Sequence, residues 1–269
     1  SPPDREFMNT RTLGVAFDPA AECPKFAAFV ALIEPDPVSR GYLQRALGVT
    51  LFGENFLQIV LLMRGSGGNG KSTMLNVLTD VLGGYAATAR IEMFLAGREE
   101  RAGQATPEEV ELPGARAMIA TEPDPGDVLS SKKIKSLTGG DRRPARALNM
   151  PQFYYRPGAV PILSFNRTPR IKGEDEGLWR RLEFLLFAVE LHKLPEGERR
   201  DPQQVRAELR DEGPGILNWL LDGFAAVRAA GGLLPPAAVR RLKDELRGAS
   251  DPDSPIVGDT IQTALMETD

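Results

Sequence analysis

The stretch from Phe56 to Leu82 reads FLQIVLLMRGSGGNGKSTMLNVLTDVL and decides the fold of this chain. Its first part, Phe56–Met63, is a continuous apolar run of strand length, which is typical of a strand buried on both faces of a sheet. Its last part, Ser72–Leu82, has helical apolar periodicity and ends at two glycines. A glycine-rich loop joins the two. This order of strand, loop and helix predicts a phosphate-binding loop.

The loop matches the pattern G-x-x-x-x-G-K-[ST] at every fixed position from Gly65 to Ser72. Glycines let backbone N–H groups curve around phosphate oxygens, and the following helix points the positive end of its dipole at the same anion. We expect Lys71 to reach the β- and γ-phosphates of ATP and Ser72 to ligate Mg²⁺. The residues expected to hold the nucleotide are Gly65, Gly67, Gly68, Asn69, Gly70, Lys71, Ser72 and Thr73.

Strands and helices alternate outward from this loop. Apolar runs predict core strands at Ala115–Ala120, Val160–Phe165 and Leu182–Val189, and two strands around a turn within Arg146–Tyr155. Helical patterns occupy Pro24 to Gly53 and recur after the last strand. We therefore predict an α/β fold with a mostly parallel sheet, flanked by helical segments at both ends.

Length and composition limit the class of protein. The 269 residues allow one full-sized domain and a smaller one. We divide them into a helical collar or linker (1–54), a P-loop ATPase core (55–192) and a C-terminal helical segment with its tail (193–269). No apolar run approaches the length of a membrane span. The single cysteine, Cys23, excludes an internal disulfide, and we interpret it and the single histidine, His192, as structural residues in a cytoplasmic setting.

Two polar side chains end predicted core strands. Glu122 follows the second strand, where a carboxylate can orient and activate the water that attacks ATP. Asn166 ends the third strand, where a neutral amide can hold that water or the γ-phosphate. The alternative for Glu122 is an exposed glutamate at a strand end, but its otherwise apolar strand favours the catalytic interpretation. The alternative for Asn166 is a residue that caps its strand into the turn Arg167–Pro169, and its register with the loop and Glu122 favours the functional interpretation. Asp124 is a weaker candidate because Pro123 bends the chain before it.

Positive charge is concentrated between Lys132 and Lys172, although the whole chain has a net charge of −4. That segment holds ten lysines and arginines and a single acid, Asp141, a pattern typical of polyanion binding. Further along, Arg180 and Arg181 follow an acidic stretch. They are either surface residues or the cations that a neighbouring subunit supplies during phosphoryl transfer.

Taken in order, these elements resemble the superfamily 3 helicases, and most of all the phage, plasmid and poxvirus-type primase–helicase group. The resemblance extends roughly from Pro24 to Leu246. The asparagine before Gly70 is far more specific than the loop pattern alone. The strings that carry the resemblance are Tyr42–Arg45 (YLQR), Gly67–Thr73 (GGNGKST), Gly114–Arg116 (GAR), Leu137–Asp141 (LTGGD), Phe165–Asn166 (FN) and Trp179–Leu182 (WRRL).

This resemblance implies an AAA+-like ATPase core assembled as a homohexameric ring, with ATP and Mg²⁺ between subunits. The implied roles are Walker A for Lys71 and Ser72, Walker B and Mg²⁺ for Glu122, sensor for Asn166, and arginine finger for Arg181 with Arg180 beside it. Two departures stand out. Thr121 replaces a second Walker B acid, and the tip of the expected hairpin, Leu148–Pro151, has no lysine or histidine.

A hairpin spanning Arg142–Arg156 is implied to project into the ring channel and grip single-stranded DNA. The side chains expected to bind DNA are Lys135, Arg142, Arg143, Arg146 and Arg156. The implied function is an ATP-dependent replicative DNA helicase subunit that translocates on single-stranded DNA. It would be the helicase part of a phage or prophage primase–helicase in a bacterial cell, with the primase module N-terminal to this chain and no membrane partner.

Two alternatives from other classes remain open: a nucleotide-gated DNA-binding or assembly module with little turnover, and a small-molecule P-loop kinase. The basic residues are spread over a hairpin and a strand end instead of a substrate lid, which argues against the kinase. Stimulation of ATP turnover by single-stranded DNA separates the three.

Overall fold

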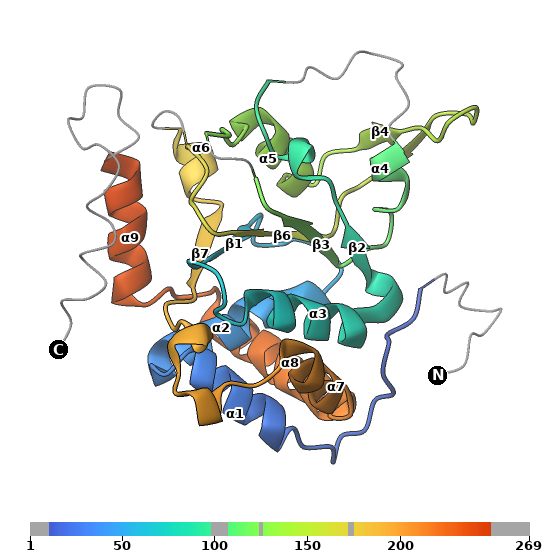
Figure 1. The fold of residues 1–269 in the computed structure, drawn as a ribbon. Coiled ribbons are helices and arrows are strands. Elements are labelled where there is room, and N and C mark those ends of the chain that lie inside the picture. The colour runs from blue at the N-terminus through green and yellow to red at the C-terminus, as the bar shows by residue number, and fades with distance from the viewer. Residues whose placement is uncertain (1–10, 98–106, 124–125, 172–174, 249–269) are drawn as a thin grey trace.

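The computed structural model describes residues 11–97, 107–123, 126–171 and 175–248. At its centre lies a five-stranded sheet in the order β2-β3-β6-β1-β7, whose neighbours all pair in parallel (Figure 1). The strands are β1 (Val60–Arg64), β2 (Ala86–Thr88), β3 (Ala117–Thr121), β6 (Val160–Phe165) and β7 (Leu182–Leu186). The predicted α/β class with a mostly parallel sheet is therefore confirmed.

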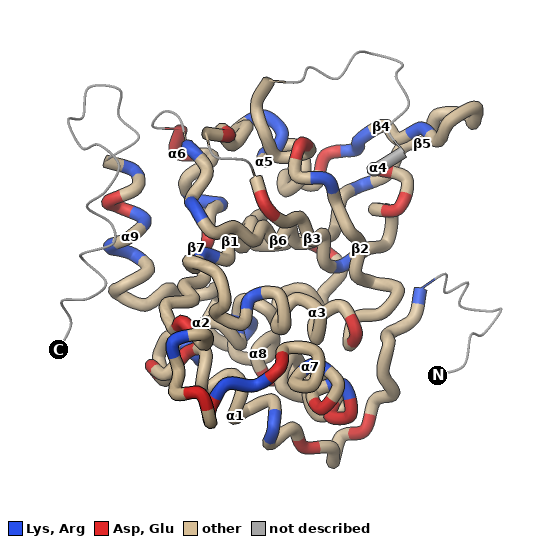
Figure 2. The backbone as a smooth tube through the Cα atoms, in the orientation of Figure 1, with Lys and Arg blue, Asp and Glu red and all other residues tan. Residues whose placement is uncertain are grey.

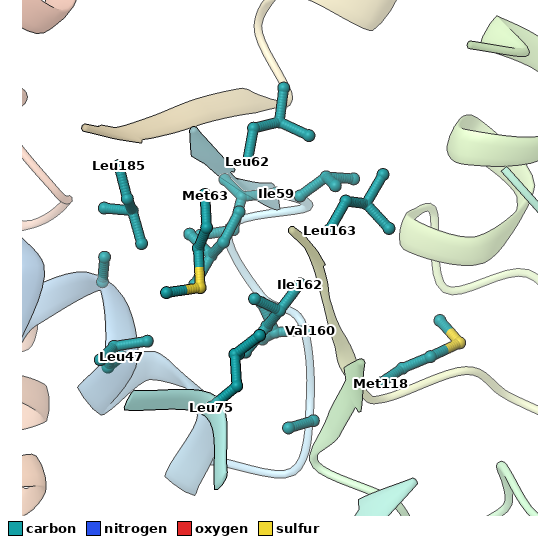
Figure 3. Packing of buried hydrophobic residues seen from close by; sticks show 14 of the residues in the cluster. Leu47, Ile59, Leu62, Met63, Leu75, Met118, Val160, Ile162, Leu163 and Leu185 are labelled. Atoms are coloured by element: carbon teal, nitrogen blue, oxygen red, sulfur yellow. The ribbon is translucent and has the colours of Figure 1, made fainter. Parts of the chain in front are cut away.

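Strands β1 and β6 form the middle of the core because nearly every side chain on them is apolar. Leu62 pairs with Leu163 on one side and with Phe184 on the other, and all three are buried. Met63 and Leu75 also lie in this cluster, which links the sheet to the helix after the loop (Figure 3). A strand that is buried on both faces does not need to alternate apolar and polar residues, which explains the continuous apolar run in the sequence.

Most of the helices gather on one side of the sheet, below it in the view of Figure 1. This group contains α1 (Pro24–Ile33), α2 (Pro37–Gly48), α3 (Lys71–Leu82), α7 (Pro202–Arg210) and α8 (Gly213–Ala230). Helices from the two ends of the chain cross closely. A Cβ atom on Gly48 would meet the Phe224 nitrogen at 2.5 Å, and one on Gly223 would meet the Gln44 oxygen at 2.3 Å. Glycine therefore lets these helices touch backbone to backbone.

The smaller elements lie on the other side of the sheet (Figure 1). They are α4 (Pro107–Val110), α5 (Ser131–Thr138), α6 (Glu176–Trp179) and the antiparallel hairpin of β4 (Arg143–Ala145) and β5 (Phe153–Tyr155). Helix α9 (Ala237–Gly248) stands beside β7. Within the described part of the chain, no helix combines the length and apolar character needed to cross a membrane.

Several boundaries differ from the sequence prediction for local reasons. Strand β1 begins at Val60 instead of Phe56 because the Asn55 side chain closes a turn, bonding both to the backbone oxygen of Ile59 at 2.8 Å and to its nitrogen at 2.9 Å. The hairpin begins at Arg143 instead of Arg146. The division at residues 54 and 192 stays a prediction. In the structure, helices before and after the sheet share one hydrophobic core with it.

Candidate nucleotide site and DNA-binding hairpin

The glycine-rich loop joins the end of β1 to the start of α3. Gly67, Gly68 and Gly70 have φ angles of 103°, 59° and 84°, in the left-handed region where side chains are strained. Helix α3 then begins at Lys71 and has no acidic residue in its first turn. The positive end of its dipole is therefore not offset locally, and it faces the loop as an anion-binding end.

Lys71 is held over the loop by oxygen atoms. Its ammonium donates to the Gly65 carbonyl at 2.7 Å, to Asn69 Oδ1 at 2.9 Å and to Asn166 Oδ1 at 3.3 Å. Burial lowers the pKa of the Lys71 amine to about 8, while the charge of Glu122 acts in the opposite direction. Predicted residues from two distant segments, the loop and the end of β6, thus lie around one cation.

The Asn69 side chain is buried between the loop and the end of β7. Its amide donates to the Phe187 carbonyl at 3.1 Å, directly after β7, while its oxygen accepts from Lys71. A Cβ atom on Gly65 would lie 1.9 Å from this amide, so the position requires glycine. The side chain of Asn69 therefore joins the loop to the segment directly after β7.

Glu122 and Asn166 stand at the carboxyl ends of β3 and β6, next to the loop after β1. Because these three strands are neighbours in the sheet, the residues converge at one edge. Glu122 has a φ of 58°, and its N–H bonds to the Ser164 oxygen at 2.9 Å. Such strained non-glycine backbone clusters at functional sites. Asp124, the weaker candidate base, lies outside the described residues.

Mg²⁺ fits this edge through oxygen donors. The Ser72 hydroxyl and the Glu122 carboxylate are both exposed and are hard ligands of the kind that Mg²⁺ takes. Among the residues that the structure describes, no group of three Asp, Glu, His or Cys side chains could enclose an ion.

One wall of the loop was not foreseen from sequence. The turn η4 (Leu191–Lys193) follows β7 and packs on the loop: the Leu191 N–H donates to the Gly68 oxygen at 2.8 Å. The Ser66 hydroxyl donates to Glu190 Oε1 at 2.8 Å, and a Cβ atom on Gly68 would meet His192 Nδ1 at 2.8 Å. The only histidine thus lies against the loop, and its isolation in the sequence gave no signal of this.

The paired arginines differ sharply in surroundings. Arg181 is buried, and its guanidinium donates to Thr138 Oγ1 at 3.0 Å, to the Gly177 oxygen at 2.5 Å and to Gln58 Oε1 at 2.9 Å. Arg180 is exposed and shares the same Gln58 oxygen at 2.9 Å. Of the two, Arg180 is the one whose side chain already faces solvent.

Two of the predicted DNA contacts are engaged inside the chain. Arg143 is buried and forms a bidentate pair with Glu109, at 2.5 and 3.2 Å. Tyr155 donates to the same carboxylate at 2.8 Å. Lys135 pairs with Asp175 at 2.5 Å. In this structure both cations are therefore paired with acids of the same chain, which the sequence did not reveal. Their roles in DNA binding stay predictions.

The exposed face of the hairpin combines positive charge with aromatic surface. Arg142, Arg146 and Arg156 are exposed, and the Arg142 guanidinium lies 5.4 Å from the ring centre of Tyr154. Figure 2 shows basic residues near the base of the hairpin and none along its tip. The tip is instead apolar: the exposed fractions of Leu148 and Met150 are 74% and 58%.

The parallel sheet, the glycine-rich loop and the polar residues at its edge define an AAA+-like P-loop ATPase core. No protein-family model matches the sequence. A protein of Acanthamoeba polyphaga mimivirus, named "Putative helicase", is 30% identical over 243 residues, which cover 86% of this chain. A "Putative helicase" of Frog virus 3 is 31% identical over 167 residues, or 61% of this chain. A "Putative primase" of African swine fever virus is 24% identical over 184 residues, or 66% of this chain.

The chain spans about a quarter of the mimivirus protein, and 17% and 19% of the other two. A solved structure, the apo A form of the NrS-1 C-terminal region, superposes with a TM-score of 0.65 at 13% identity. It covers 89% of this chain and 55% of that one, which shows a shared fold. The chain is therefore similar to viral proteins named as putative helicases and as a putative primase, and it shares its fold with the NrS-1 C-terminal region.

Proposed function

We propose that this chain is the ATP-hydrolysing motor of a replicative DNA helicase, one subunit of a homohexameric ring that moves along single-stranded DNA. The observation that carries the proposal is the convergence of Lys71, Asn166 and Glu122 at the carboxyl ends of β1, β6 and β3. A phosphate-binding cation, an amide and a carboxylate in this arrangement suit hydrolysis of a bound triphosphate.

Each side chain has a distinct part in the proposed reaction. Lys71 and the loop N–H groups bind the phosphates, and Asn166 orients the γ-phosphate or the attacking water. The Glu122 carboxylate accepts the proton of that water as the oxygen attacks phosphorus and ADP leaves. Bound Mg²⁺, held through Ser72 with Glu122 nearby, would neutralise phosphate charge. An exposed arginine, Arg180 or a released Arg181, completes the site of the next subunit.

The hairpin supplies a surface suited to single strands. Arg142, Arg146 and Arg156 can neutralise backbone phosphates, and Tyr154 offers a flat ring on which a base can stack. The much greater length of the viral relatives, together with the relative named as a primase, supports a primase module elsewhere in the complete protein. Phage origin and a bacterial host remain predictions, since all three relatives are viral but none is named as a phage protein.

Steady-state ATP turnover, with and without single-stranded DNA, tests the proposal. The wild-type chain should hydrolyse ATP faster when DNA is added and should separate a forked duplex. Glu122→Gln should still bind ATP but turn it over at least about a hundredfold more slowly, because the general base is lost while its shape remains. ATP turnover that ignores DNA would favour the kinase, and nucleotide-dependent DNA binding without turnover would favour the assembly module.

A further inference from the structure

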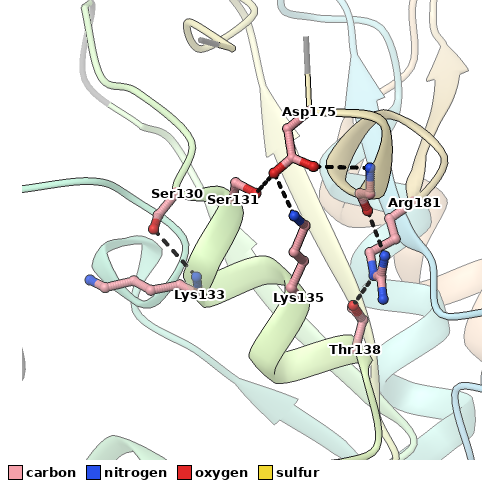
Figure 4. Close-up of polar contacts among 8 residues, drawn as sticks. Ser130, Ser131, Lys133, Lys135, Thr138, Asp175 and Arg181 are labelled. Carbon is pink, nitrogen blue, oxygen red and sulfur yellow. Dashed lines mark hydrogen bonds and ion pairs between the residues drawn. The ribbon is translucent and has the colours of Figure 1, made fainter. Parts of the chain in front are cut away.

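Helix α5 lies between the hairpin and the segment that carries the two arginines. Ser131, Lys135 and Thr138 follow helical spacing i, i+4 and i+7, so they share one face, while Ser136 points about a quarter turn away. Figure 4 shows the shared face turned toward Asp175 and Arg181. The helix is anchored from behind by the buried side chains of Ile134 and Leu137, which tie its movement to that of its packing partners.

On the arginine side, α5 holds the start of α6. Asp175 accepts from the Lys135 ammonium at 2.5 Å, from the Ser131 hydroxyl and from the Gly177 N–H at 3.0 Å (Figure 4). The hydrogen bonds from Lys135 and Ser131 lower the pKa of the Asp175 carboxyl to about 2. The carboxylate is therefore ionised at physiological pH and accepts these hydrogen bonds as a charged group.

Thr138 extends this link to the arginine itself. Its hydroxyl accepts from Arg181 Nε at 3.0 Å and donates to the Ile134 oxygen at 2.8 Å, and the residue is buried. The same guanidinium donates to the Gly177 oxygen at 2.5 Å. The Arg181 side chain, next to Arg180, is thus held by α5 and by α6, whose start α5 contacts.

On the hairpin side, α5 contacts the base of β4. The Ser136 hydroxyl meets Arg143 Nη1 at 2.5 Å, and the rest of that guanidinium is bound by Glu109. Tyr155, on β5, donates to the same carboxylate. A buried charge held by several hydrogen bonds resists separate movement of its parts. The two hairpin strands and α5 are therefore joined at one point.

We propose that α5 is the connection through which DNA held by the hairpin sets the position of the Arg180–Arg181 edge, with Thr138 and Asp175 as positioning residues. DNA that shifts the hairpin would shift Arg143, then α5, then the arginines that serve the neighbouring ATP site. The inference rests on the proposed function and adds the route by which DNA stimulates turnover.

Matched variants of the full chain separate this route from a merely structural role. Thr138→Val keeps the shape but loses the acceptor for Arg181, whereas Thr138→Ser keeps the hydroxyl. Asp175→Asn still caps α6 but loses its charge. Lys133→Met is the control, because it removes a positive charge from the same helix. The Lys133 ammonium donates to the Glu92 backbone oxygen instead of to Asp175 in the proposed route. ATP affinity, DNA affinity, thermal midpoint and turnover with and without DNA are measured for each.

Thr138→Val and Asp175→Asn should bind ATP and DNA as the wild type does, yet lose about tenfold of the DNA-stimulated turnover, as expected for a lost charged hydrogen bond. Thr138→Ser and Lys133→Met should keep the stimulation. If DNA stimulates ATP turnover by Thr138→Val and Asp175→Asn as strongly as it stimulates the wild type, the route through α5 is wrong. The same holds if they lose DNA affinity itself. A wild type without any stimulation contradicts the proposed function instead.

Discussion

At the scale of single residues, burial decides what each cation can do. Lys71 is almost enclosed, and the loss of hydration lowers the pKa of its amine to about 8. Arg143 carries the same sign of charge but is buried against Glu109, while Arg142 and Arg146 are exposed on the same hairpin. Basic residues that look equivalent in the sequence therefore divide into a buried cation at the loop, a buried ion paired with a carboxylate, and exposed cations on the hairpin.

The lowered pKa of Lys71 predicts a pH-dependent affinity for ATP. Bound phosphates favour the protonated amine, so above pH 8 binding must take up a proton, and affinity should fall as pH rises, by at most about tenfold per unit. Titration calorimetry between pH 7 and 9.5 measures this fall. Lys71→Arg, which stays charged, should bind with little pH dependence in that range. An equal fall in both proteins would place the titrating group elsewhere.

Arg143→Met should reduce the stability of the fold more than it reduces DNA affinity. It leaves Glu109 buried without its partner, and breaking such a pair costs about 3–5 kcal/mol. Urea unfolding measures the loss, and the double variant with Glu109→Gln should recover part of it. The contrasting change, Arg142→Ala with Arg146→Ala, should leave unfolding unchanged and flatten the salt dependence of DNA binding. An unchanged free energy of unfolding in Arg143→Met would show that the Arg143–Glu109 pair contributes little to stability.

At the scale of elements, periodicity identified the core strands and the helices, because burial on the sheet imposes patterns that one sequence displays. It missed β2, a three-residue edge strand with too few side chains to form a pattern. It also placed the start of β1 at Phe56, where an apolar residue lies outside the sheet with an exposed fraction of 44%. Apolar character alone does not distinguish a strand from a surface aromatic cluster.

At the candidate site, too, some features could be predicted from the sequence and others could not. The loop motif and two strand-end residues were enough to predict which side chains meet, because parallel strands bring their carboxyl ends to one edge. The partners of Arg143 and Lys135 were not predictable, since Glu109 and Asp175 lie 34 and 40 residues away. The contact of η4 with the loop was not predictable either, because it depends on where the chain turns after β7.

The exposed aromatic ring of Tyr154 on the hairpin is expected to stack on a base of single-stranded DNA. Tyr154 has an exposed fraction of 57% and lies beside the Arg142 guanidinium. Tyr154→Ala should weaken binding of single-stranded DNA by about 1–3 kcal/mol, the usual value of one stacked base. Tyr154→Phe, which keeps the ring, should bind like the wild type. Fluorescence anisotropy with a labelled oligonucleotide measures both, and equal weakening by the two changes would point to the hydroxyl instead of stacking.

At the scale of the whole molecule, the active site is expected to be divided between subunits. The described residues of one chain place Lys71, Glu122 and Asn166 together, while the arginine pair stands at the far end of α6, where Arg180 faces solvent. An arginine supplied from outside accelerates phosphoryl transfer by about a thousandfold or more. In the proposed ring, that arginine comes from the neighbouring subunit.

Mixing two inactive variants tests the shared site. Arg180→Ala and Glu122→Gln should each bind ATP and hydrolyse it poorly, and the mixture should recover activity, because some interfaces pair an intact Glu122 with an intact Arg180. Turnover is measured after subunit exchange has been verified by fluorescence transfer between labelled chains. Arg181→Ala should instead lower the melting temperature, since its side chain bonds within its own chain. A mixture that exchanges but stays inactive would contradict the division.

The strand order also governs how the chain matures during synthesis. Strand β1 is made early, yet its partners β6 and β7 begin about a hundred residues later. At ordinary ribosomal rates, the apolar segment 60–64 is synthesised roughly 5–20 s before the first of these partner strands. An exposed strand of this kind is a target for chaperones and a starting point for aggregation. Slow codons within that interval should therefore lower the soluble yield more than slow codons after β7.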